Sequence, residues 1–136
     1  MGERPTEIPP GTPGPGYARA PRHRVAFVPR RARVTVEALG LRLADTTDVV
    51  AVEEDGYPPR NYVARDGVDM SRLEKTDKVT YCPFKGLATY YLVRGAQGEL
   101  RDAVWSYERT FREAELLRDR VAFDADQVDE SVEPPT

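Results

Sequence analysis

The 136-residue chain has one cysteine, Cys82, and one histidine, His23. A single cysteine cannot form an internal disulfide, and this is typical of proteins in a reducing compartment, so we expect a cytoplasmic location. Nor can these two residues supply the four ligands of a structural zinc site. The composition therefore predicts no metal and gives no sign of a cofactor. Because His23 lies in a proline-rich N-terminal segment, we expect no histidine for a catalytic triad in the folded part.

Long hydrophobic runs are also missing. No segment approaches the roughly 18 apolar residues that a membrane-spanning helix needs, and the N-terminus lacks the continuous apolar stretch of a secretory signal. The formal net charge of -3 gives no global attraction to nucleic acid or anionic lipid. We therefore expect neither a membrane nor a nucleic acid as partner.

Proline and charge are unevenly distributed along the chain. Residues 1–32 hold seven of the twelve prolines and six arginines against two glutamates. This composition favours a disordered Pro/Gly/Arg-rich arm, most simply a solvated tail, although a basic arm could also contact an acidic partner. Residues 126–136 form an acidic tail that we expect to fray. The sequence thus predicts one folded domain over residues 33–125.

Within that domain, hydrophobic residues alternate with period two, as in strands that are buried on one face. We expect strands at 34–38, 41–43, 49–52, 60–65, 77–82, 87–94, 99–107 and 121–123. Residues 49–52, Val-Val-Ala-Val, read as a strand buried on both faces. Capping-box patterns predict one helical turn at 71–74 and an α-helix from Thr110 to about Arg120. About seven or eight antiparallel strands with one real helix make the predicted fold all-β and mainly antiparallel.

The first candidate site is the turn that contains the single cysteine. Pro83 favours a type I turn from Cys82 to Lys85, which would bring the lysine ammonium near the sulfur. A neighbouring cation favours the thiolate, so Cys82 and Lys85 are candidate catalytic residues, with Tyr81 as a proton donor. The alternative is that Cys82 is a small buried hydrophobic residue at a strand end.

Aromatic and cationic side chains around this turn form the second candidate site. Strand alternation places Tyr90 on the opposite face from Tyr91, and a concave face with Tyr62, Tyr90 and Trp105 would form an aromatic pocket. The candidate ligand-binding residues are Tyr62, Arg65, Tyr90, Trp105, Tyr107 and Arg60. As the alternative, aromatic stripes on strands are ordinary core, and the arginines are surface charges.

Several motifs at fixed spacing also resemble a known family. They are Gly56-Tyr57-Pro58-Pro59, then Tyr62 and Arg65, then Thr80-Tyr81-Cys82-Pro83-Phe84-Lys85-Gly86 with Ala88 and Tyr90, and finally Ala103-Val104-Trp105-Ser106-Tyr107. Over about residues 33–125 this combination resembles the bacterial family called domain of unknown function 427. The resemblance implies a β-tent, in which two antiparallel sheets meet along one edge, as in methionine sulfoxide reductases of the B type and the ligand-binding domain of cereblon.

Many proteins of that fold class hold a structural zinc with paired CxxC motifs, which this chain lacks. The family has also been labelled a nucleotidyltransferase domain, yet the sequence shows no paired aspartates for two metal ions. The first hypothesis is a module that binds an unknown small molecule, partly anionic or aromatic, in the aromatic pocket beside Lys85. The second is an enzyme that uses Cys82, followed by nucleotidyl transfer and by a structural or interaction domain. Unpaired sheet edges leave a homodimer open.

Overall fold

The structure is a computed structural model and describes residues 4–135. Its ten strands are β1 Val25–Arg30, β2 Arg33–Ala38, β3 Leu41–Thr46, β4 Val49–Glu54, β5 Arg60–Val63, β6 Leu73–Cys82, β7 Gly86–Gly95, β8 Gly98–Thr110, β9 Val121–Phe123 and β10 Asp129–Glu133. The helical segments are α1 Gly16–Arg19 and three 3₁₀ turns, η1 Arg65–Gly67, η2 Met70–Arg72 and η3 Arg112–Leu117. Within residues 4–135, no helix has the length and hydropathy that crossing a membrane requires.

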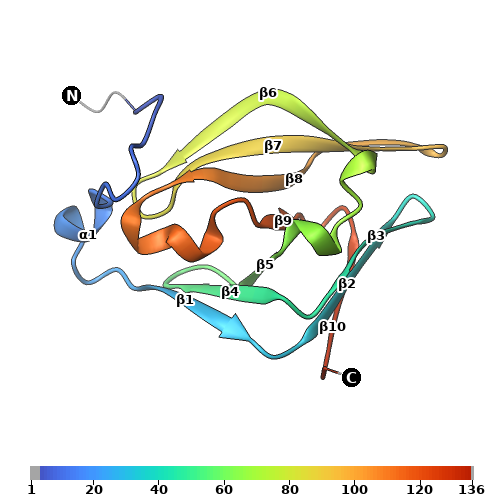
Figure 1. Ribbon diagram of the computed structural model, residues 1–136, viewed down its shortest axis with the longest axis horizontal. Coiled ribbons are helices and arrows are strands. Elements are labelled where there is room, and N and C mark those ends of the chain that lie inside the picture. The colour runs from blue at the N-terminus through green and yellow to red at the C-terminus, as the bar shows by residue number, and fades with distance from the viewer. Residues whose placement is uncertain (1–3, 136) are drawn as a thin grey trace.

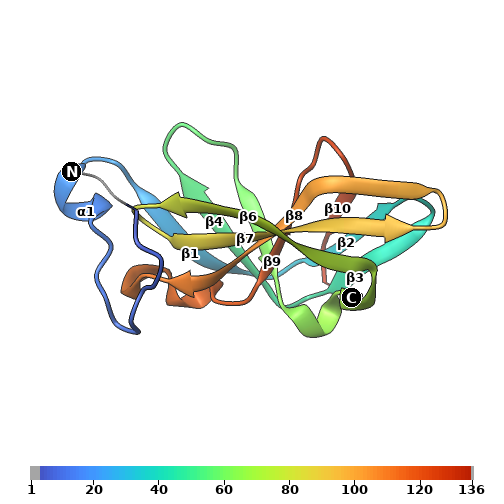
Figure 2. The same cartoon turned by 90° about the horizontal axis from the view of Figure 1, so that it is seen from above.

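The strands form two antiparallel sheets. One has seven strands in the order β1-β4-β5-β9-β8-β7-β6, and the other has three in the order β10-β2-β3. In Figure 1, β6, β7 and β8 run along the top and β1 and β4 along the bottom, so the large sheet bends strongly through β9 and β5. Figure 2 shows the same arrangement from above, with the small sheet at one end. The predicted all-β, mainly antiparallel fold in two sheets is confirmed.

Two hydrophobic clusters lie on opposite faces of the large sheet. Val49 and Val63 belong to the cluster shared with the small sheet, whereas Val50 and Tyr62 belong to the cluster on the other face. Successive side chains of a strand point to opposite faces, so β4 is buried on both sides, as its Val-Val-Ala-Val run predicted. The second cluster forms the floor of the candidate site.

Two strands lie outside the predicted 33–125 domain. β1 pairs with β4 and forms one edge of the large sheet, where Pro29 is tolerated because an edge strand has unpaired donors. β10, within the predicted acidic tail, pairs with β2. The folded region of the structure therefore extends past the predicted bounds at both ends.

The predicted α-helix from Thr110 to Arg120 is wrong. Thr110 is the last residue of β8 and pairs with Gly86, and the residues that follow form the 3₁₀ segment η3, with non-helical angles at Ala114. No side chain caps its start. Strand pairing and burial of Leu117, which is fully enclosed, outweigh the local capping preference. The predicted turn at 71–74 corresponds to η2, one residue earlier.

Candidate functional site

A pocket of about 550 Å³ opens on the concave face of the large sheet. Its walls come from β4, β5, β6, β7 and β8, from the turn between β6 and β7, and from the N-terminal arm. Eight of the nine predicted site residues line it: Arg60, Tyr62, Tyr81, Cys82, Lys85, Tyr90, Trp105 and Tyr107. The structure thus gathers residues that lie up to 47 positions apart in the sequence (from Arg60 to Tyr107) around one cavity.

The turn at Cys82–Lys85 forms as predicted. The backbone N–H of Lys85 donates to the carbonyl oxygen of Cys82 at 3.3 Å. Gly86 then begins β7 with φ +134°, and a Cβ on it would lie 2.1 Å from the carbonyl oxygen of Arg109. Only glycine avoids both the strained φ and this clash, so Gly86 fixes how closely the turn approaches β8.

The ammonium of Lys85 has a hydrogen-bond partner that the sequence did not suggest. Its Nζ donates to Oε1 of Glu54 at 2.6 Å, and the two side chains are only 12% and 11% exposed. The prediction placed this ammonium near the Cys82 sulfur, which lines the same pocket. Glu54 takes the hydrogen bond because an ionised carboxylate is a stronger acceptor than a thiol. Glu54 shares a face of β4 with Val50 and Val52, so strand alternation was the signal that would have found it.

His23 also reaches this site from the arm. Its Nε2 lies 2.8 Å from Oε2 of Glu54, and its ring packs on Phe84 with the ring centroids 4.8 Å apart. The expectation that His23 lies apart from the folded part is therefore wrong. The arm is tied to the turn by two further bonds, from the Gly16 N–H to the Pro83 carbonyl at 3.0 Å and from the Tyr17 hydroxyl to the Phe84 carbonyl at 3.2 Å.

The electrostatics keep the Lys85–Glu54 pair ionised. Burial alone would raise the pKa of Glu54, but hydrogen bonds from Lys85 and His23 outweigh it and hold that pKa below its ordinary value. Burial alone would lower the pKa of Lys85, but the hydrogen bond to Glu54 and nearby negative charge raise it. The pair is therefore fully charged at neutral pH.

Aromatic side chains wall the rest of the pocket. The Trp105 indole Nε1–H donates to the Tyr62 hydroxyl at 3.1 Å, and the Tyr90 ring lies 6.1 Å from that of Trp105. The Arg60 guanidinium stacks over Trp105 at 5.0 Å and donates to the Phe123 carbonyl at 2.8 Å. These contacts fix the orientation of the indole in the pocket wall.

Tyr81 and Arg65, two of the predicted site residues, have contacts that the sequence pattern did not predict. Tyr81 lines the pocket but also packs edge-on against Phe111, 6.2 Å away. Arg65 does not line the pocket, because it follows β5 in η1, and its side chain lies on the other face of the large sheet. The interpretation of Arg65 as a residue of the aromatic pocket is not supported by this placement.

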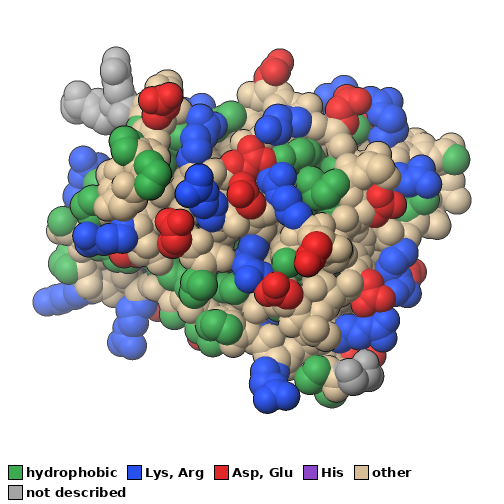
Figure 3. Space-filling model, viewed as in Figure 1, with side chains coloured by type: hydrophobic (Ala, Val, Ile, Leu, Met, Phe, Trp, Pro, Cys, Tyr) green, Lys and Arg blue, Asp and Glu red, His purple; other side chains and the backbone are tan. Residues whose placement is uncertain are grey.

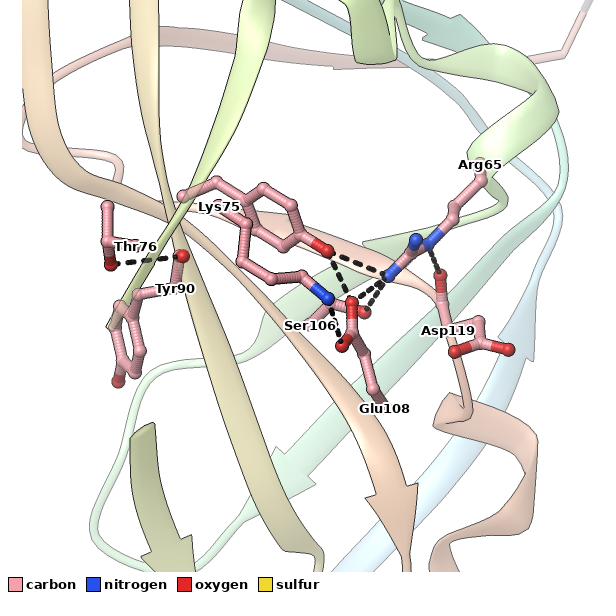
Figure 4. Close-up of polar contacts among 8 residues, drawn as sticks. Arg65, Lys75, Thr76, Tyr90, Ser106, Glu108 and Asp119 are labelled. Atoms are coloured by element: carbon pink, nitrogen blue, oxygen red, sulfur yellow. Dashed lines mark hydrogen bonds and ion pairs between the residues drawn. The ribbon is translucent and has the colours of Figure 1, made fainter. Parts of the chain in front are cut away.

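Arg65 instead belongs to a polar cluster shown in Figure 4. Its Nη2 lies 2.6 Å from Oε2 of Glu108 and 3.0 Å from Oγ of Ser106, while Tyr91 donates to Glu108 and Lys75 pairs with it at 3.2 Å. Burial alone would raise the pKa of Glu108, yet these donors lower it to about 2. The cluster ties η1 to β6, β7 and β8, which is a structural role.

The charged side chains on the face seen in Figure 3 do not mark a second site. On the face seen in Figure 3, basic and acidic side chains are interspersed rather than gathered into a patch of one sign. Within residues 4–135, no group of three or more His, Cys, Asp or Glu side chains is placed to share a metal ion. The pocket beside the Cys82–Lys85 turn is thus the strongest candidate site in the described chain.

Comparison with protein families gives one result. The family model described as "Domain of unknown function (DUF427)" matches residues 26–134, which takes in β10 and nearly all of β1. A search of curated proteins found no match to the chain.

Proposed function

The chain belongs to the family described as domain of unknown function DUF427, and from that premise we propose that it is a small-molecule-binding module whose ligand occupies the aromatic pocket. The observation that carries the proposal is the pocket itself, about 550 Å³ in volume and walled by rings and a few polar groups. Ligand sites of proteins have this size and this mixture of apolar walls with sparse polar groups.

The polar groups of the pocket support binding rather than simple core packing. An ion pair as enclosed as Lys85–Glu54 contributes little net stability relative to apolar residues of the same size. Its position at a cavity, beside a half-buried cysteine, is what a recognition site requires. Tyr62 and Tyr107 belong both to the hydrophobic cluster that forms the floor and to the lining of the pocket.

Native mass spectrometry after incubation with a cell metabolite extract tests the proposal. We expect the wild-type protein to retain a ligand and to gain thermal stability from it, because a ligand that binds only the folded state stabilises that state. Trp105→Ala removes a wall and should abolish both effects, whereas Leu116→Ala, an exposed residue outside the pocket, should change neither. Arg60→Ala provides a second variant if Trp105→Ala folds poorly. A wild-type protein that retains nothing and gains no stability contradicts the proposal.

A second candidate function is an enzyme that uses Cys82 as nucleophile or redox thiol. The observation in its favour is that this free, half-exposed thiol shares the pocket with Lys85 and with the phenols of Tyr62 and Tyr81, either of which would donate a proton. The test is the rate of Cys82 alkylation by iodoacetamide against pH. A midpoint well below the ordinary thiol pKa of about 8.5 supports an enzyme, and a thiol that is inert in the native protein contradicts it.

Nucleotidyl transfer, suggested by one label of the family, is not proposed. Such transfer commonly depends on carboxylates that hold two metal ions close together, and residues 4–135 contain no group of this kind. A purely structural role does not account for an enclosed ion pair at the wall of a cavity.

A further inference from the structure

The aromatic pocket is rich in hydrogen-bond donors. The Tyr62 oxygen accepts from Trp105, and the Tyr90 oxygen accepts from the Thr80 hydroxyl at 3.2 Å, so both phenols keep an O–H to donate. The Tyr107 hydroxyl has no hydrogen-bond partner within residues 4–135. Burial raises the pKa of both Tyr62 and Tyr107, so these phenols remain protonated at neutral pH.

The ammonium of Lys85 adds further donors. It carries three N–H groups, and Glu54 is its one hydrogen-bond partner in the described part of the chain. The Nζ atom also lies 6.0 Å from the ring centroid of Tyr107. Two N–H groups of an enclosed cation are therefore left for an acceptor that enters the pocket.

Acceptors in the same pocket are few and already engaged. Glu54 is the one carboxylate among the lining residues, and each of its oxygens has a partner, Lys85 at 2.6 Å and His23 at 2.8 Å. The Cys82 sulfur is a weak acceptor. Against this single negative charge stand Lys85 and Arg60, so the lining carries a net positive charge even with His23 neutral.

We infer that the ligand of this pocket carries an oxyanion, a carboxylate or a phosphate, on a planar apolar body, and this inference rests on the proposed function. The oxyanion accepts from the ammonium of Lys85 and from the hydroxyls of Tyr107 and Tyr62. The planar body lies along Trp105, whose ring is held in place by its bond to Tyr62 and by the stacked guanidinium of Arg60. Hydrogen bonds to charged groups are stronger than neutral ones, and more so where water is excluded.

Four naphthalene compounds of similar shape test the inference by isothermal titration calorimetry. They are 2-naphthoate, 2-naphthyl phosphate, the neutral 2-naphthamide and the cationic 2-(aminomethyl)naphthalene. We expect at least one of the two anions to bind about tenfold or more tightly than the amide, and the cation to bind most weakly. The two anions distinguish a carboxylate site from a phosphate site.

Variants assign the selectivity to the proposed donors. Lys85→Met combined with Glu54→Gln removes the charge pair without leaving a buried carboxylate alone, and it should reduce the preference for the anion to less than about threefold. Lys85→Arg keeps the charge and should retain a preference. Tyr107→Phe removes one hydroxyl. It should weaken binding of the anion several-fold while leaving binding of the amide unchanged.

The outcomes separate the inference from the proposed function. Equal binding of anion and amide, or a preference for the cation, overturns the inference and leaves a small-molecule site in place. If none of the four probes binds but the protein retains a metabolite, the inference of a planar ligand with an oxyanion is overturned. Failure of the probes together with retention of no metabolite overturns both proposals.

Discussion

The Nζ atom of Lys85 lies 2.6 Å from Oε1 of Glu54, and this bond joins the turn after β6 to the end of β4 across the bend of the large sheet. Both side chains are nearly enclosed, so each charge depends on the other for its compensation. The second carboxylate oxygen holds His23 of the arm. The Glu54 carboxylate therefore holds both Lys85 and His23 in position at the pocket.

Breaking this pair should be costly. Lys85→Met leaves the Glu54 carboxylate with His23 alone, and we expect a loss of roughly 2–4 kcal/mol in the free energy of unfolding, measured in urea. The double variant Lys85→Met/Glu54→Gln should recover most of that loss, because no charge is left buried. Losses that simply add across the two substitutions would show that the two side chains are not coupled.

Acidification should weaken the Arg65–Glu108 cluster. The folded pKa of Glu108 is about 2, below the ordinary carboxyl value of 4.5, so its stabilising contribution is complete above 4.5 and is lost as pH falls toward 2. Glu108→Gln should lower stability by about 1–3 kcal/mol at pH 7 and flatten the decline between pH 4.5 and 2. The free energy of unfolding is measured in urea at each pH. If that of the variant falls between pH 4.5 and 2 as steeply as that of the wild type, this assignment is contradicted.

Alanine substitutions at Gly86 and Gly98 distinguish the cost of backbone strain from the cost of a steric clash. Gly86 and Gly98 have φ of +134° and +124°, but an added Cβ meets the Arg109 carbonyl at 2.1 Å in the first case and open space in the second. Gly98→Ala should cost about 1–3 kcal/mol from strain alone. Gly86→Ala should cost clearly more, about 1–3 kcal/mol beyond that value, or prevent folding. Equal thermal midpoints for the two variants would contradict the close approach at Gly86.

A buried hydroxyl offers a stabilising substitution. Oγ1 of Thr110 is enclosed and has no hydrogen-bond partner within residues 4–135. Thr110→Val replaces it with a methyl group of similar size and should raise the free energy of unfolding by about 1 kcal/mol. As the matched control, Ser106→Ala removes an enclosed hydroxyl that accepts from Arg65 at 3.0 Å, and it should lower stability by about 1 kcal/mol. A destabilised Thr110→Val would indicate a partner for that oxygen.

Packing of the arm on the turn should be visible in limited proteolysis. A Cβ at Gly16 would lie 2.8 Å from the Phe84 ring, so Gly16→Ala should loosen the arm and speed tryptic cleavage after Arg19 several-fold. Ala20→Ser, an exposed change in the same segment, should leave the rate unchanged. Cleavage of the wild-type arm as fast as that of a free peptide would support the disordered arm predicted from composition.

Much of the fold follows from local pattern. The continuous apolar run of β4 and the alternation along β7 and β8 identified these strands. Alternation also placed Tyr90 and Tyr91 on opposite faces, and the structure has Tyr90 in the pocket and Tyr91 in the core. The prediction of a helix after Thr110 was wrong because the capping pattern is local. It does not include the pairing of Thr110 with Gly86 in the sheet. Arg65, which was expected at the pocket, lies in η1 after the end of β5 and is not among the lining residues.

The sequence by itself determined which side chains share a strand face, because the two-residue period of an extended chain is a property of covalent geometry. Only the tertiary structure decided which faces meet. His23 lies 31 residues before Glu54 and Lys85 lies 31 residues after it, so their joint contact depends on the bend of the large sheet and on the return of the arm over the turn. Contacts of that separation form when the whole chain closes, and no local pattern specifies them.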